Sequence, residues 1–231
     1  MKTKFAIIIY FTFILFTVIG TLSHEFGHFI VGRYLGSKTS IHYSSTSWGE
    51  SELYDKIIKI YTENKDAIDA EKDFPQKRKF DILCAESYRN SFWFTFGGPF
   101  QTIFTGTTGV LLILFIRKRH QFATKLSHWI CLFLALFWLR QPINLSSWIL
   151  NKPINGSSSF SGDEILLARD LDLPNGSIIW VTGILGSIIS GFVILKFVPK
   201  DKLLTFCISG FLGGISGIIL WLKILGPIIL P

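Results

Sequence analysis

The sequence predicts an all-α polytopic membrane protein with about five transmembrane helices and a polar loop after the first. Hydrophobic residues make up 49% of the 231 residues, and Phe alone occurs 22 times. A bilayer core needs about 20 mostly apolar residues per helix. The stretches that meet this requirement are residues 5–35, 92–116, 127–150, 177–198 and 203–230. We therefore expect a multi-pass integral membrane protein that has the lipid bilayer as a partner.

Charge and cysteine content exclude some classes of function. The net charge of +7 lies mostly in loops and membrane flanks, where anionic lipid headgroups suffice as partners. No part of the chain resembles a nucleic-acid-binding module, so we expect no nucleic-acid partner. The three cysteines are scattered and form neither a zinc-ligand pattern nor a disulfide framework.

The first span, in region 1–36, carries the most informative motif. Its apolar run continues without a signal-peptide cleavage site into His24-Glu25-Phe26-Gly27-His28, an HExxH sequence. On a helix, His24 and His28 lie on one face and can bind one metal ion, with Glu25 beside them as the general base. Ionisable side chains within hydrocarbon are costly and usually functional. The motif predicts a Zn2+ site with His24 and His28 as metal ligands and Glu25 as the catalytic residue, in a helix that ends near a Gly36 C-cap.

A polar segment, 37–91, separates the first span from the transmembrane bundle of residues 92–231. Within it, residues 55–70 indicate a short amphipathic helix, with a solvated linker as the alternative. The second span begins at residue 92 and contains Gly97, Gly98 and Pro99, which predict a break in the helix. Irregular backbone at membrane depth is tolerated where protein or water covers it. We expect these three residues to bind an extended substrate strand.

The loop 151–176 is expected to supply a third zinc ligand. Counting sides across five spans places the end of the first helix, the start of the second and this loop on one membrane face. A zinc ion that keeps one position open needs three protein ligands. Asp163 is the expected ligand, Glu164 is the alternative, and Asp170 and Asp172 are lesser candidates. Within the third span, Arg140 is expected to form a structural ion pair.

The last two spans carry small residues at helix-packing intervals. Gly210 and Gly214 form one GxxxG pair, and Gly213 and Gly217 form another. Such pairs allow helix backbones to approach closely inside a membrane. We expect them to pack helices rather than to form a functional site.

Three stretches together resemble the site-2 protease family of intramembrane zinc metalloproteases (peptidase family M50). His24 to His28 resemble the HExxH helix of that family, and Gly97 to Pro99 resemble its Gly-Pro element. The third stretch, which would hold the third ligand and a substrate-facing Asn, comprises Asn144, Leu145, Pro153, Gly162 and Asp163.

The resemblance implies a zinc endopeptidase that hydrolyses peptide bonds in or near transmembrane segments of membrane proteins. It implies Zn2+ as cofactor, Asn144 as a substrate-binding residue, a membrane-protein substrate as partner and the bacterial inner (plasma) membrane as location. Alternatives remain open: a non-catalytic pseudoprotease or scaffold, an ion-relay transporter, and a CAAX-type membrane zinc endopeptidase. The last would use a Glu as third ligand, which Glu164 could supply.

Overall fold

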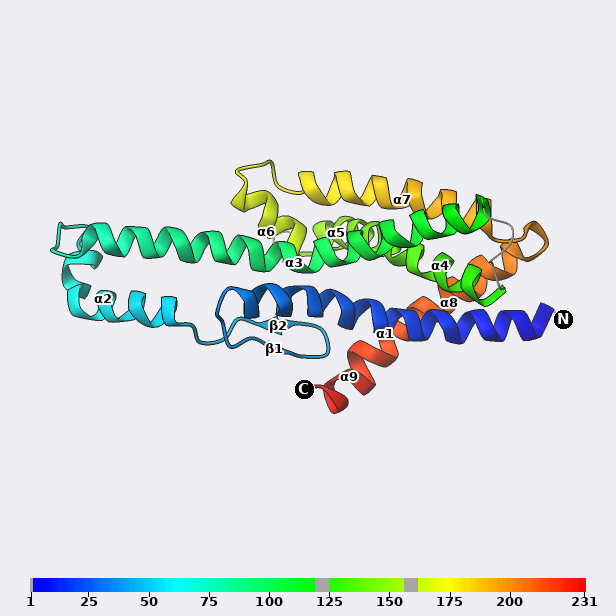
Figure 1. Ribbon diagram of the computed structural model, residues 1–231, viewed down its shortest axis with the longest axis horizontal. Helices are drawn as coiled ribbons and strands as arrows, with labels where there is room; N and C mark the ends of the chain where they lie inside the picture. The colour runs from blue at the N-terminus through cyan, green and yellow to red at the C-terminus, as the bar shows by residue number, and fades with distance from the viewer. Residues whose placement is uncertain (1, 119–124, 156–161) are drawn as a thin grey trace.

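The computed structural model describes residues 2–118, 125–155 and 162–231 (Figure 1). Its α-helices and its one hairpin within these ranges are α1 (Lys2–Tyr34), β1 (Ser40–Ile41), β2 (Thr46–Ser47), α2 (Glu52–Asp69), α3 (Lys77–Lys118), α4 (Lys125–Ala135), α5 (Arg140–Asn155), α6 (Asp163–Asp170), α7 (Ser177–Phe197), α8 (Leu203–Ile219) and α9 (Gly226–Ile229). Short 3-10 helices, Leu136–Leu139 and Lys200–Lys202, precede α5 and α8, and a π-helical turn, Leu220–Leu225, joins α8 to α9.

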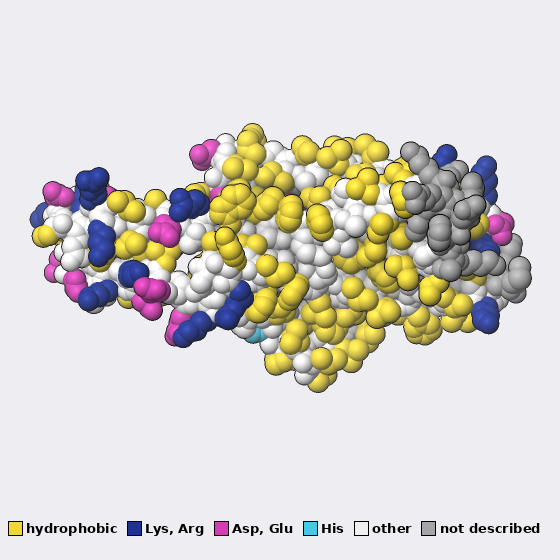
Figure 2. All heavy atoms as spheres, in the orientation of Figure 1, with side chains coloured by type: hydrophobic (Ala, Val, Ile, Leu, Met, Phe, Trp, Pro, Cys, Tyr) yellow, Lys and Arg dark blue, Asp and Glu magenta, His cyan; other side chains and the backbone are white. Residues whose placement is uncertain are grey.

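The predicted fold class is confirmed. Among the described residues, five helices are long and apolar enough to cross a membrane: Thr3–Tyr34, Lys77–Phe115, Leu126–Asn151, Ser177–Phe197 and Lys200–Ile229. Yellow apolar side chains cover the middle of the molecule, while charged side chains gather towards its two ends (Figure 2). The chain is therefore a multi-pass membrane protein.

Helix α1 packs against α3 and α8, and these are the most extensive contacts between the described helices. An aromatic cluster fixes the second contact: the Phe13 ring lies 5.2 Å from the Phe133 ring and 5.5 Å from the Phe206 ring, in edge-to-face arrangements. Helix α7 packs on α5, and α6 packs on α3 and α7. These contacts bring the C-terminal part of α1, the middle of α3 and the start of α6 together (Figure 1).

The polar segment after α1 contains more helix than its composition predicts. Helix α1 ends at Tyr34, and Gly36 takes the positive φ of +81° expected of a Gly C-cap. The amphipathic helix expected at residues 55–70 is α2, whose N-cap Ser51 accepts a hydrogen bond from the Tyr54 amide. Helix α3 begins at Lys77 rather than at residue 92, so its first turns are polar and extend beyond the apolar run.

The predicted break at Gly97, Gly98 and Pro99 is wrong, because α3 runs through all three residues. The two glycines serve close packing instead: a Cβ on Gly97 would lie 2.7 Å from the Gly27 carbonyl oxygen of α1. All three residues are buried. The helix break on which their expected role rested is therefore absent, and their role in substrate binding stays a prediction.

Both glycines of the Gly213–Gly217 pair lie at the interface between α1 and α8, but only Gly210 of the other pair does. Added Cβ atoms on Gly213 and Gly217 would lie 2.4 Å from the Tyr10 carbonyl oxygen and 2.9 Å from the Thr17 side chain, respectively. Gly210 also faces α1, whereas a Cβ on Gly214 would meet no atom within 4 Å. The packing role predicted for these glycines therefore applies to the face that carries Gly213 and Gly217.

Gly213→Ala is expected to lower the free energy of unfolding by about 1–3 kcal/mol, because the new methyl group would force α1 and α8 apart. The neighbouring Gly214→Ala is the matched control and should be neutral or slightly stabilising, since Ala favours a helix over Gly. Unfolding of both variants in mixed detergent micelles measures the difference. Equal losses of stability would contradict the assigned interface.

Candidate metal centre

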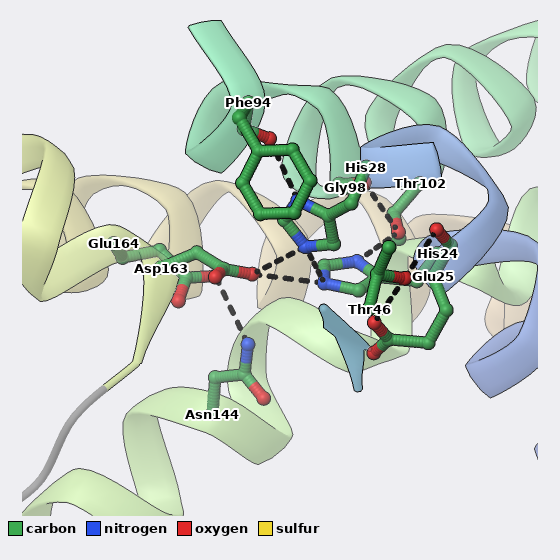
Figure 3. A network of polar contacts seen from close by, with 10 residues as sticks. All are labelled: His24, Glu25, His28, Thr46, Phe94, Gly98, Thr102, Asn144, Asp163 and Glu164. Atoms are coloured by element: carbon green, nitrogen blue, oxygen red, sulfur yellow. Dashed lines mark hydrogen bonds and ion pairs between the residues drawn. The ribbon is translucent and has the colours of Figure 1, made fainter. Parts of the chain in front are cut away.

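Three side chains from α1 and α6 converge at one point inside the bundle (Figure 3). The Nε2 atom of His24 lies 2.9 Å from Asp163 Oδ2, and the Nε2 atom of His28 lies 3.3 Å from the same oxygen. The two Nε2 atoms are 3.3 Å apart. Both histidines are buried. Within the described part of the chain, this is the group of His, Cys, Asp and Glu side chains that could hold a metal ion.

The other ring nitrogen of each histidine is fixed by α3. His28 Nδ1 donates to the Phe94 carbonyl oxygen at 2.7 Å. The Thr102 hydroxyl gives its proton to the Gly98 carbonyl at 3.2 Å, so it accepts a hydrogen bond from His24 Nδ1 at 3.0 Å. Both imidazoles therefore carry their proton on Nδ1 and present an unprotonated Nε2. Hydrogen bonds of this kind orient metal-binding histidines.

The arrangement fits a metal ion of zinc type. Two imidazole nitrogens and one carboxylate oxygen face one another, so a single cation could be bound by all three. Ligand atoms about 2.0–2.2 Å from a tetrahedral zinc are separated by about 3.3 Å, and the observed separations are 2.9–3.3 Å. The donor set and its spacing therefore suit Zn2+ with the fourth position open.

Asp163 reaches the histidines from the first turn of α6. Gly162 takes the N-cap position, which leaves the Asp163 carboxylate free to point at α1. The Asp163 side chain remains 26% exposed, so solvent can reach the site at this carboxylate.

Glu164 follows Asp163 directly but is not part of the group formed with the two histidines. Its Oε1 atom accepts a hydrogen bond of 2.9 Å from Asn144 Nδ2 (Figure 3). Burial raises the pKa of Glu164, and the Asn144 hydrogen bond partly opposes that rise. Asn144 thus contacts Glu164, and its role in substrate binding stays a prediction. Asp170 is not part of the group around the histidines, and its Oδ1 atom accepts a hydrogen bond from the Tyr88 hydroxyl at 3.3 Å.

Glu25 is buried beside the histidines and contacts the hairpin. The Thr46 hydroxyl of β2 lies 2.8 Å from the Glu25 carbonyl oxygen and 3.1 Å from its Oε2. Neither Thr46 nor Thr102 is predicted from the sequence as a site residue. The position of Thr102, four residues after Gly98 and thus on the same helix face, is a weak local signal. No sequence signal indicates Thr46, because its contact with Glu25 depends on how the hairpin folds back on α1.

Arg140 lies close enough for its charge to act on His24, Glu25 and Glu164. Among the described residues it forms no ion pair within 4.0 Å, and its buried Nε has no hydrogen-bond partner. The ion pair expected for Arg140 is therefore not found there. Its positive charge instead adds to the field around the metal centre.

Gly98→Ala is expected to weaken zinc binding by about 10–100-fold, the range seen when groups around metal ligands are changed. The added Cβ would lie 2.3 Å from His28 Nε2 and 2.6 Å from His24 Nε2, and α3 prevents either ring from moving away. Gly20→Ala, on a helix face with no atom within 4 Å, is the matched control. Zinc affinity measured by chelator competition tests this, and equal affinities would contradict the assigned metal position.

Comparison with known proteins finds no match for this chain: neither a family model, nor a curated protein, nor a solved structure is similar to it. The chemistry of the centre therefore has to be inferred from its own geometry.

Proposed function

We propose that the chain is an intramembrane zinc metalloprotease of the site-2 protease type. The observation that carries this proposal is the convergence of His24, His28 and Asp163, with both Nδ1 protons already engaged by α3. This ligand set leaves a position for water or substrate on the ion. The HExxH motif supplies a carboxylate, Glu25, next to the first histidine.

Each residue has a role in peptide hydrolysis. A zinc ion held by His24, His28 and Asp163 would polarise the scissile carbonyl and acidify the attacking water. Glu25 accepts a proton from that water and later returns it to the leaving amine. Glu25 is buried, and apolar surroundings screen charges poorly. The positive charge of Arg140 therefore acts strongly on the Glu25 carboxylate.

The proposed substrate is a segment of a membrane protein that lies in or near the bilayer. Its peptide bond must be freed from helical hydrogen bonding before water can attack the carbonyl. The five spans support access through the lipid bilayer. By the resemblance, the proposed location is the bacterial inner (plasma) membrane.

The alternatives have less support from the site. A CAAX-type enzyme would use a Glu as third ligand, but Glu164 is bound to Asn144. A scaffold has no need of a carboxylate beside two metal-binding histidines. An ion relay would need a chain of titratable groups across the membrane, whereas the described group of His, Cys, Asp and Glu is local.

A cleavage assay tests the proposal. The purified protein in liposomes is mixed with a panel of single-span transmembrane peptides, and the products are identified by mass spectrometry. We expect cleavage that stops with 1,10-phenanthroline and returns with added zinc. Stoichiometric zinc without cleavage of any peptide would favour the scaffold, and cleavage that resists the chelator would overturn the assignment of zinc as cofactor.

A further inference from the structure

The hairpin of β1 and β2 makes a contact with Glu25 that the proposed reaction does not by itself require. We propose that Thr46 is a positioning residue, which holds the Glu25 carboxylate in place for proton transfer, and that the C-terminal segment anchors the hairpin for this purpose. This inference rests on the proposed function. It adds a hydroxyl group and a remote support to the metal centre, neither of which belongs to the HExxH motif.

The Thr46 hydroxyl lies within hydrogen-bond distance of two acceptor oxygens of Glu25. It lies 2.8 Å from the Glu25 carbonyl oxygen and 3.1 Å from Glu25 Oε2 (Figure 3). The hydroxyl has a single proton, and the charged carboxylate is the stronger acceptor. A free Glu side chain rotates about three bonds. One short contact beside the backbone removes much of that freedom and keeps the carboxylate near the position of the attacking water.

The register of the two strands places the Thr46 side chain on the face of the hairpin that contacts α1. Thr46 pairs with Ile41, and the next pair along the hairpin is Ser40 with Ser47. Side chains of successive strand residues point to opposite faces, so Ser47 points away from α1 and its hydroxyl instead lies 2.6 Å from the Ser40 hydroxyl. Glu25 therefore receives one hydroxyl from the hairpin, and Ser47 offers a natural control on the opposite face.

The far end of the hairpin is fixed by the C-terminal segment. The Tyr43 amide donates to the Leu230 carbonyl oxygen at 2.9 Å, and the indole Nε1 of Trp221 donates to the Tyr43 carbonyl oxygen at 2.8 Å. Trp221 is buried and belongs to the π-helical turn after α8. Gly226 lies so close to the Tyr43 side chain that a Cβ there would come within 2.8 Å.

Together these contacts fix the turn of the short hairpin and the first residue of β2. A two-stranded hairpin alone is marginally stable, so external hydrogen bonds must fix its position. Single π-helical turns occur frequently at functional sites, and this one directs an indole donor at the hairpin turn. Trp221 is far from the metal ligands in the sequence, so no sequence motif indicates its role. Through Tyr43 and Thr46, it helps to hold the Glu25 carboxylate in position.

Binding of acetohydroxamic acid to the cobalt-substituted protein tests the inference without relying on turnover. A hydroxamic acid chelates the metal and gives a hydrogen bond to the neighbouring base, and visible absorption of cobalt reports its binding. The variants are Thr46→Val, which keeps the β-branched shape, Thr46→Ser, which keeps the hydroxyl, and the control Ser47→Ala. Glu25→Gln sets the scale for complete loss of the carboxylate.

We expect Thr46→Val to keep its metal and to bind acetohydroxamic acid about 10–100-fold more weakly, the range for losing a hydrogen bond to a charged group. Thr46→Ser and Ser47→Ala should match the wild type. In the cleavage assay, Thr46→Val should lower kcat and leave KM unchanged, because the contact acts on the base rather than on substrate binding. Trp221→Phe should change kcat in the same direction, by a smaller factor.

Three results would overturn the inference. Hydroxamate affinity and kcat of Thr46→Val that equal the wild type, while Glu25→Gln is impaired, would remove the positioning role and leave the proposed function intact. An equal defect in Ser47→Ala would show a general effect of the hairpin. A wild-type protein that binds neither metal nor hydroxamate would overturn the proposed function as well. If Thr46→Val does not fold, Thr46→Ala and Thr46→Ser allow the same comparison.

Discussion

Replacing His28 by alanine, or Asp163 by asparagine, is expected to reduce bound zinc from about one ion per chain to near zero. His28→Ala removes one of three converging ligand atoms, and Asp163→Asn replaces the anionic one, which lies 2.9 Å from His24 Nε2. Two ligands left in a site built for three bind a divalent ion weakly. Elemental analysis of protein purified in detergent without chelators measures the loss.

Glu164→Gln is the matched control for these variants. Glu164 is adjacent to Asp163 and more deeply buried, yet its carboxylate is bound to Asn144, so its replacement should leave the zinc content unchanged. Loss of zinc from His28→Ala and Glu164→Gln, with retention in Asp163→Asn, would assign the third ligand to Glu164. A wild-type chain without zinc after supplementation would contradict the metal centre itself.

Glu25→Gln is expected to keep its zinc and to lower the rate of cleavage by about 10²–10⁴-fold, the usual contribution of a general base. The amide is close in size to the carboxylate and can still contact the Thr46 hydroxyl, but it cannot accept a proton from water. Comparing zinc content and kcat in the same preparations separates this effect from loss of the metal.

A small effect of Glu25→Gln on kcat would contradict the assignment of Glu25 as base. Loss of zinc from Glu25→Gln would instead give Glu25 a structural role at the metal centre. Thr95→Ser is a control on α3, because Thr95 is buried in the same part of α3 and none of the metal-site contacts described above involves it. It should leave both quantities unchanged.

The parts of the site that the sequence predicts are those set by local geometry. His24 and His28 share a helix face wherever α1 lies, so the motif alone places two ligands. Composition also predicts the five spans, apart from the polar start of the second at Lys77, and their alternation across the membrane puts Asp163 on the same side as the motif. The structure brings these three residues together.

The choice between Asp163 and Glu164 depends on information that is not local. Consecutive residues in a helical turn point about 100° apart, and the rotation of α6 is set by its packing on α3 and α7. Asn144, from α5, then captures the Glu164 carboxylate. No sequence pattern fixes this rotation, and so both carboxylates were reasonable candidates for the third ligand.

Other features of the fold and site are not predicted, because the same residues fit more than one structure or carry no motif. Gly97, Gly98 and Pro99 are typical of a break in a helix, yet tight contact with α1 keeps α3 helical through them. The polar start of α3 at Lys77 lacks the apolar content by which a membrane span is recognised. Thr46 lies in a polar segment with no motif, and only the folded hairpin brings it to Glu25.

The length of α3 also determines which part of a substrate would be cut. Gly98, which lies against both histidines, is about 30 Å from the Lys118 end of the helix, a distance close to the thickness of the hydrocarbon core. It is only about 9 Å from Phe92, where the apolar run begins. A peptide bond hydrolysed at this depth yields two unequal fragments: a long one still buried across most of the bilayer, and a short one free to leave into water beside α2.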